Sequence, residues 1–336
     1  QYLTPKEALE LRGNKYSKVL LEGILVPWLR EHNTIYFKGR QVPFSEGNIL
    51  SAVQALDNIP LEGLILTNEK IFDLLSLGKS LQQSIDGDIK SFTLNYIDWV
   101  NPQNNVYHVT EEFGVERTGS HQTRRPDIVL FVNGIPMGVI ECKSPDIKDP
   151  IGEAVSQHIR NQKEDEIPKL FLYSQILLAL SKNEAKYATT GTAAKFWAVW
   201  REQTDDFDEK VKHTIDKPLT PEQIERMNYT GQWIVRENTE EYLVDNRQIT
   251  AQDKALVSLC DPKRFLEITY KFLLFDAGTR KIARYQQYFV VKKIMHRINK
   301  QNAEGNRTGG VVWHTQGSGK SLTLSLIHIS EPTRPY

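Results

Sequence analysis

Cysteine is nearly absent from this sequence, and so is any long apolar run. The two cysteines, Cys142 and Cys260, cannot build a disulfide framework in 336 residues. No apolar stretch approaches the ~18–20 residues that a membrane-spanning helix needs. The opening QYLTPKEALELR lacks the charged and apolar regions of a signal peptide. These absences argue against a disulfide-rich secreted protein and a membrane partner, and they predict a protein of the reducing cytoplasm.

The sequence also lacks a net charge of either sign, because 42 basic side chains balance 42 acidic ones. Any nucleic-acid partner must therefore be held by a local basic patch. The remaining composition, 40% hydrophobic and 25% charged, is typical of a globular protein. The length exceeds one ordinary domain of ~100–200 residues, so two compact units with a connector are expected.

Helical and strand-like runs alternate in the first 200 residues, which predicts an α/β fold. Helical spacing occurs at 19–32 and 151–162, and strand-like runs at 128–132 and 137–142. Charged and amide residues then crowd together, as in a surface connector. Helical patterns resume at 264–275 and 281–300, before a short strand-like run at 311–313. We predict a first domain at 1–200, a connector at 201–260 and the start of a second domain at 261–336.

The segment RRPDIVLFVNGIPMGVIECKSP, residues 124–145, combines a hairpin pattern with charges at the strand ends. The Asn-Gly pair at 133–134 between two apolar runs is a strong hairpin signal. Asp127 precedes the first run, and Glu141 and Lys143 end the second. Phosphodiester hydrolysis needs a divalent metal, and carboxylates are the usual Mg²⁺ ligands.

The spacing within this hairpin sets which side chains share a face. Glu141 and Lys143 are two residues apart on a strand, so they point the same way, while Cys142 points to the opposite, buried side. A strict two-residue loop would place Asp127 opposite Ile140, on the wrong face from Glu141. We therefore predict a bulge or a longer loop between residues 132 and 137.

Pro126-Asp127, a spacer of 13 residues and Glu141-Cys142-Lys143 resemble the PD-(D/E)xK nuclease motif. The resemblance implies that Asp127 and Glu141 bind Mg²⁺, with the Cys142 carbonyl as a further candidate ligand, and that Lys143 assists the attacking water. The alternative is a hairpin with solvated charges at its ends.

A second motif is VVWHTQGSGKS, residues 311–321, a strand-like run that leads into a Gly-rich turn and a helix. That context suits a phosphate-binding loop, in which Lys320 reaches the β/γ-phosphates and Ser321 binds Mg²⁺. His314 stands where the full Walker A pattern has its first glycine, a departure that superfamily 2 helicases tolerate. Arg284-x-x-Gln287-x-x-Val290 is similar to the adenine-reading Q-motif of these helicases. The predicted ATP contacts are Gln287, Thr315, Gly317, Ser318, Gly319, Lys320 and Ser321.

A PD-(D/E)xK hairpin followed by this phosphate loop resembles the restriction (R) subunit of type I restriction-modification enzymes, from about residue 16 to 323. The resemblance implies a mixed-sheet, restriction-endonuclease-like domain and the beginning of a RecA-like P-loop motor lobe. It implies a site-specific deoxyribonuclease that cleaves duplex DNA with Mg²⁺ after ATP-driven translocation, in complex with methylation and specificity subunits. In the family's Q-x-x-x-Y motif, Gln157 fits as a residue that orients the site, but Asn161 stands where tyrosine is expected.

Each of the other candidate residues has two possible interpretations. Glu22 is either a further site carboxylate or a solvated side chain. The cations that bracket the hairpin either neutralise phosphates or form a charged rim, and they are Arg117, Arg124, Arg125 and Lys148. His108, His121 and His158 lack zinc-ligand spacing with the cysteines, so no structural metal is predicted.

From about residue 324 the sequence departs from the family, and we expect this tail to be foreign and not a native terminus. The Walker B acid and the arginine finger are not found, so ATP turnover is expected only in the full-length family protein. The alternative function is a non-catalytic nucleotide- or DNA-binding module of a helicase-like protein. Convergence of Asp127, Glu141 and Lys143 in one concave site discriminates between the two.

Overall fold

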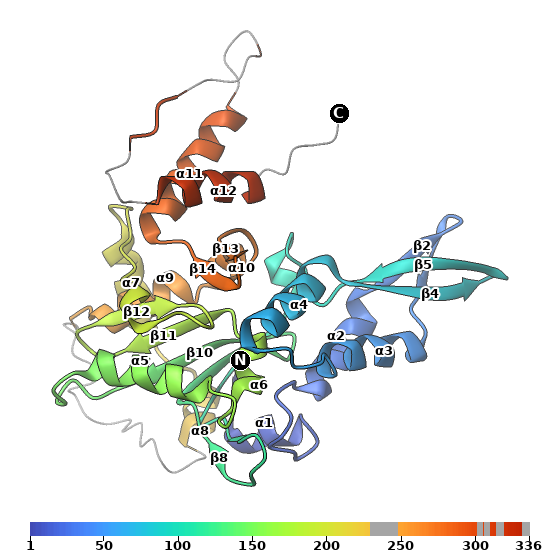
Figure 1. Ribbon diagram of the computed structural model, residues 1–336, viewed down its shortest axis with the longest axis horizontal. Helices are drawn as coiled ribbons and strands as arrows, with labels where there is room; N and C mark the ends of the chain where they lie inside the picture. Colours follow the sequence, from blue (N-terminus) through green and yellow to red (C-terminus); the bar gives the residue numbers. More distant parts are fainter. Residues whose placement is uncertain (229–247, 301–304, 306–309, 314–318, 331–336) are drawn as a thin grey trace.

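A computed structural model describes residues 1–228, 248–300, 305, 310–313 and 319–330 of the chain. Within them, strand-like runs assemble into a six-stranded sheet of order β1-β6-β9-β10-β11-β12 (Figure 1). Its strands are β1 (Tyr2–Leu3), β6 (Tyr107–Glu111), β9 (Ile128–Val132), β10 (Ile135–Cys142), β11 (Ile176–Leu180) and β12 (Ala185–Ala188). The β1–β6 and β10–β11 pairs are parallel and the other neighbours antiparallel. The predicted α/β class with a mixed sheet is confirmed.

Strands β10 and β11 form the buried middle of this sheet. Every residue of β11 is buried, and in β10 only Cys142 is partly exposed. Continuous apolar runs of this kind are typical of strands covered on both faces. Helix α5 (Pro150–Asn161) packs against both strands, and Phe265 of α10 (Pro262–Lys271) lies against Gly138 on the opposite face. The hairpin with the predicted site is thus enclosed between two helices.

Helix α5 forms as its amphipathic pattern predicts. The side chain of Asp149, the N-cap, accepts a hydrogen bond from Gly152 N at 2.9 Å. Pro150 occupies the first turn, where its missing N–H has no helical partner to lose. The buried positions recur at helical spacing, and they are Ile151, Ala154, Val155, His158 and Asn161. This stripe faces the sheet and leaves Glu153 and Arg160 exposed.

The remaining elements surround the sheet. The two-stranded hairpins are β2 (Thr34–Phe37) with β3 (Arg40–Pro43), β4 (Lys79–Ile85) with β5 (Asp88–Leu94), β7 (Val115–Glu116) with β8 (Thr123–Arg124), and β13 (Leu273–Asp276) with β14 (Thr279–Ile282). The other helices of this part are α1 (Pro5–Glu10), α2 (Glu22–His32), α3 (Glu46–Asp57), α4 (Leu64–Leu77), α6 (Pro168–Tyr173), η1 (Pro102–Asn104) and η2 (Ala194–Phe196). Figure 1 shows the β2–β3 and β4–β5 hairpins projecting from the body.

The later elements are α7 (Phe207–Ile215), α8 (Pro221–Asn228), α9 (Ala251–Leu259), α11 (Tyr285–Asn299) and α12 (Lys320–Ser330). Buried side chains of α10, Phe265 among them, belong to the same hydrophobic core as the sheet. Arg280 of β14 is buried and donates to Asn68 Oδ1 of α4 at 2.6 Å. The predicted domain limits at residues 200 and 260 stay predictions. In the described residues, no helix combines the length and the apolarity that crossing a membrane requires.

Two sequence-based expectations differ from the structure in this region. The helical run at 264–275 ends at Lys271, and its last residues form β13. Ala277 and Gly278 adopt positive φ, so a tight hairpin turn overrides the helical spacing. Residues 311–313 are not a strand, since no described strand pairs with them. The helical run at 281–300 is confirmed only from Tyr285, where α11 begins, because Lys281 and Ile282 belong to β14. The run at 19–32 becomes α2, which starts only at Glu22.

The Asn133-Gly134 turn is held closely against α2, which makes Gly134 sensitive to substitution. Gly134 has a φ of +81°, and a Cβ built there would lie 2.6 Å from Leu21 O. We expect Gly134→Ala to lower the free energy of unfolding by about 2–4 kcal/mol, through backbone strain plus the clash. Gly87→Ala is the matched control, because Gly87 has a φ of +84° but open space around it. Equal losses in urea denaturation of both variants would contradict the clash.

Candidate active site

A β-bulge in the β9–β10 hairpin decides which carboxylates meet. Next to the turn the strands pair as a two-residue loop dictates, but the register shifts between Pro136 and Gly138. Beyond the shift, the register places Asp127, one residue before β9, opposite Glu141 instead of Ile140. The predicted irregularity is confirmed.

Asp127 is fixed at the end of β10 by a main-chain hydrogen bond. Its Oδ2 accepts from Cys142 N at 2.7 Å, and its side chain is half-buried. The two carboxylates are close enough for the charge on Asp127 to oppose ionisation of Glu141. The structure therefore brings together the two residues that the sequence interpretation assigned to metal binding.

Glu141 is fully buried beneath α5, with 0% of the residue exposed. Its Oε2 accepts from Gln157 Nε2 at 2.6 Å, and Asn161 Nδ2 lies 3.5 Å from its Oε1. Burial, then the charge of Asp127, raise the pKa of Glu141 to about 8, although Lys143 opposes the rise. Without a cation, the protonated form of this carboxyl group is thus favoured at neutral pH.

The burial of the site differs from the sequence-based expectation. Cys142 was expected to point to a buried side, opposite to Glu141, whereas Glu141 is completely enclosed and Cys142 is half-buried. The physical reason is that α5 covers the face on which Glu141 lies. Burial also raises the pKa of the Cys142 thiol to about 11, so this thiol is not a nucleophile at neutral pH.

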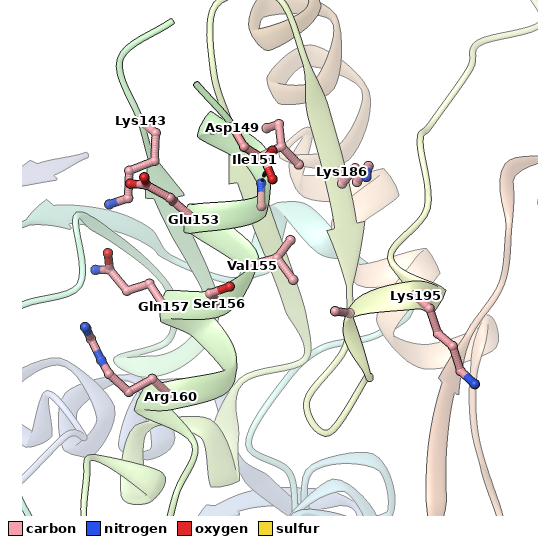
Figure 2. Close-up of a pocket in the computed structure, with 12 residues that line it drawn as sticks. Lys143, Asp149, Ile151, Glu153, Val155, Ser156, Gln157, Arg160, Lys186 and Lys195 are labelled. Carbon is pink, nitrogen blue, oxygen red and sulfur yellow. Dashed lines mark hydrogen bonds between the residues drawn. The ribbon is translucent and has the colours of Figure 1, made fainter. Parts of the chain in front are cut away.

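Lys143 follows β10 directly and stands at the open side of the site. Its main-chain N–H donates to Leu180 O at 2.9 Å, and its side chain is half-exposed. It forms no ion pair with any residue that the structure describes. Lys143, Gln157 and Arg160 line one side of an open hollow of about 850 Å³ over α5 (Figure 2).

The donor set fits a hard divalent cation. Asp127 and Glu141 lie opposite each other in the hairpin, and the charge of Asp127 disfavours ionisation of Glu141. Mg²⁺ is commonly bound by one or two carboxylates while it keeps several waters. Among the described residues there is no group of three or more His, Cys, Asp or Glu side chains placed to hold a metal. A Mg²⁺ ion at this pair would therefore depend on water and substrate oxygens for its other ligands.

The arginines before Asp127 have a structural partner. The guanidinium of Arg124 makes two contacts with Glu166, at 2.6 and 2.8 Å, and Arg117 lies 3.2 Å from the same carboxylate. Glu166 is 5% exposed and follows α5. Arg117 and Arg124 therefore belong to a charged rim of the hairpin. Their ion pairs with Glu166 hold the segment before Asp127 against the end of α5. Sequence reasoning missed Glu166, because 42 residues separate it from Arg124.

We expect Glu166→Gln to destabilise the protein by about 1–2 kcal/mol at pH 7, a value reduced because the Arg124 side chain is 34% exposed. The hydrogen bonds from Arg124 lower the pKa of Glu166. The stabilising effect of the ionised Glu166 is thus present above the ordinary carboxyl pKa, and it is lost as pH falls through the lowered pKa of Glu166. Thermal unfolding of wild type, Glu166→Gln and the exposed control Glu164→Gln from pH 7 to 3 measures this. A difference that persists undiminished at pH 3 would contradict the ion pair.

Glu22 is not brought to the site. It pairs with Lys18 on the first turn of α2. Leu21 N, just before it, donates to Gly134 O at 2.8 Å, so this end of α2 lies at the hairpin turn. Asp127 and Glu141 lie at the opposite end of the hairpin, which makes Glu22 a surface carboxylate.

The predicted ATP contacts are only partly described. Thr315, Gly317 and Ser318 lie outside the described residues. Gln287 is 3% exposed, accepts from Arg284 N at 2.8 Å and donates to Gly319 O at 3.3 Å. Lys320 and Ser321 begin α12 and are exposed. The structure thus places the candidate Q-motif glutamine against Gly319, directly before Lys320.

The histidines form no zinc site within the described chain. His158 is buried in α5, with its Nε2 2.9 Å from Leu178 O. Burial lowers the pKa of His158 to about 4, so the ring is neutral and serves as a core side chain.

Comparison with known proteins shows which protein families this chain resembles. A family model described as the N terminus of the type I restriction enzyme R protein matches residues 2–196. A second, described as SWI2/SNF2 ATPase, matches residues 286–330. The first match covers the sheet, the hairpin and α5, and the second covers α11 and α12.

Curated relatives carry names of the same kind. The "Putative type I restriction enzyme MjaIXP endonuclease subunit" of Methanocaldococcus jannaschii is 29% identical over 280 residues, which are 82% of this chain and 25% of the relative. The type I restriction enzyme HindI endonuclease subunit of Haemophilus influenzae is 25% identical over 323 residues, which are 94% of this chain and 27% of the relative. The chain thus spans about a quarter of the length of the curated relatives it matches.

Proposed function

Since the chain belongs to the family of type I restriction enzyme R proteins, and carries residues of their N-terminal part, we propose that its hairpin site cleaves DNA. In this proposal the full-length protein is the R subunit of a type I site-specific deoxyribonuclease. It cleaves duplex DNA with Mg²⁺ after ATP-driven translocation, in complex with methylation and specificity subunits. The fold of residues 1–200 is then restriction-endonuclease-like, and residues 261–336 begin a RecA-like motor lobe.

One observation carries the proposal: Asp127 lies beside a fully buried Glu141, with Gln157 bonded to that carboxylate and Lys143 at the open side. A buried carboxylate beside a second one is unfavourable unless a cation or a proton neutralises it. Hairpin charges that served only solubility would be solvated. The convergence therefore favours an enzyme over a non-catalytic nucleotide- or DNA-binding module.

Each residue has a role in this reaction. Asp127 and Glu141 would hold Mg²⁺, which, when bound, polarises the phosphoryl oxygen and lowers the pKa of the attacking water. Gln157 keeps Glu141 oriented through its amide donor. Lys143, with no carboxylate partner in the described chain, is free to donate to the attacking water or to the charge that develops on the phosphate.

The ATP site of the proposal uses Gln287 for adenine and the Lys320 amine for the phosphates. The hydrogen bond from Gln287 to Gly319 O supports it, because adenine and phosphates must be reached from the same place. The hydrolysis and the translocation are assigned to the full-length protein.

Plasmid nicking by this chain in Mg²⁺ tests the nuclease assignment. Nicking by the wild type that is lost in Lys143→Ala supports it. Equal nicking by both proteins would assign the activity elsewhere.

A further inference from the structure

Lys186 lies in the same row of the sheet as Glu141. It pairs with Ala179 across β12 and β11, and Ala179 pairs with Glu141 across β11 and β10. Side chains at paired positions point to the same face, so Lys186 and Glu141 both emerge on the face that α5 covers. With strands ~4.8 Å apart, their Cα atoms are separated by about 10 Å.

Helix α5 covers Glu141 and separates Lys143 from Lys186. It packs on β10 and β11, where Gln157 reaches Glu141, and β12 lies beyond it. Figure 2 shows Lys143 and Gln157 on one side of α5 and Lys186 and Lys195 on the other. All of them line the same open hollow of about 850 Å³.

Positive charge prevails in this hollow. Its charged lining consists of Lys143, Arg160, Lys186 and Lys195 against Asp149 and Glu153. Asp149 is occupied as the N-cap of α5. In the described chain, neither Lys186 nor Lys195 forms an ion pair, in contrast to Arg124, which is neutralised by Glu166. Amines without carboxylate partners on a concave surface are suited to phosphate oxygens.

The exposed side of α5 leaves room for a bulky ligand. Gly152 and Ser156, both small, lie in the lining between the two sets of cations. The major groove of a duplex is ~12 Å wide, close to the spacing of Glu141 and Lys186. A duplex laid across α5 would therefore reach both flanks of the helix at once.

We propose that duplex DNA straddles α5, with the strand to be cut on the Lys143 side of the helix, and with Lys186 and Lys195 binding phosphates of the opposite strand. The inference rests on the proposed nuclease function and adds where the second strand lies. Lys186 and Lys195 bind and position DNA, and they take no part in the chemistry.

Fluorescence anisotropy of the full chain with a labelled duplex, in EDTA and at several salt concentrations, tests this. Lys186→Gln and Lys195→Gln are each expected to weaken binding several-fold and to reduce the slope of log K against log salt by about 1. Lys90→Gln is the matched control, since Lys90 is exposed on the distant β4–β5 hairpin (Figure 1). Wild-type affinity and slope in both hollow variants, or an equal loss in Lys90→Gln, would overturn the proposal.

A single-stranded oligonucleotide tests the strand assignment. If the two lysines bind the opposite strand, their variants lose more affinity for the duplex than for the single strand. Equal losses on both ligands would refute the straddling geometry. Because binding is measured without metal, failure here is separate from failure of the nuclease assignment, which Lys143→Ala tests by cleavage.

Discussion

Replacing Glu141 by glutamine is expected to abolish Mg²⁺-dependent cleavage and, without metal, to make the protein more stable at pH 9. Burial beneath α5 and the charge of Asp127 raise the pKa of Glu141 from 4.5 to about 8. A carboxyl whose pKa is raised on folding stabilises the fold below its unfolded pKa. That contribution is lost as pH rises through the folded value. Metal-free wild-type protein should thus lose stability between about pH 4.5 and 8.

At ~1.4 kcal/mol per pKa unit, the full loss is at most about 5 kcal/mol, and relaxation around the charge makes about 2–4 kcal/mol the expected range. Urea denaturation in EDTA at pH 5 and pH 9 measures it. Glu141→Gln should lack the decrease, and Glu153→Gln, which removes an exposed carboxylate from α5, should keep it. Added Mg²⁺ should restore wild-type stability at pH 9 but leave Glu141→Gln unchanged. Identical pH profiles for wild type and Glu141→Gln would contradict the assigned burial and charge.

Cleavage by the assembled enzyme is expected to fall by about 10²–10⁴-fold in Lys143→Ala, the range typical of a lost proton-transfer or charge-stabilising group. Lys143 is half-exposed and forms no described ion pair. The thermal unfolding midpoint of the Lys143→Ala protein should therefore differ little from that of the wild type. Asp127→Asn should cause a comparable loss through weaker metal binding, which higher Mg²⁺ concentrations partly reverse.

Lys148→Ala is the matched control for this prediction. Lys148 is an exposed lysine of the segment between β10 and α5, and it is not part of the lining of the hollow. Plasmid cleavage rates with each protein in complex decide the outcome. A wild-type rate in Lys143→Ala, or the same loss in Lys148→Ala, would exclude the role given to Lys143.

Much of the local structure could be predicted from the sequence. The Asn-Gly pair at 133–134 predicts a two-residue turn, and the apolar runs on each side of it predict the strands. The amphipathic pattern at 151–162 predicts α5 to within one residue at each end, since the helix is found at Pro150–Asn161. A bulge was predictable as well, because without it Asp127 and Glu141 would lie on opposite faces of the hairpin.

Only the tertiary structure decided the environment of these residues. Burial of Glu141 depends on α5 folding back over the sheet, and the pairing of Arg124 with Glu166 joins residues far apart along the chain. The row that joins Glu141 to Lys186 exists because β11 inserts between their strands.

The physical reason for this division lies in the range of the interactions. Turn geometry, strand alternation and helix periodicity are set by neighbours within a few residues, so the sequence alone determined the nuclease-like hairpin, the helix after it and the family they resemble. Desolvation, ion pairing and strand order depend on which distant segments pack together. The pKa of Glu141, the neutralised arginines and the second row of cations were therefore decided by the packing of α5 and β12 against the hairpin.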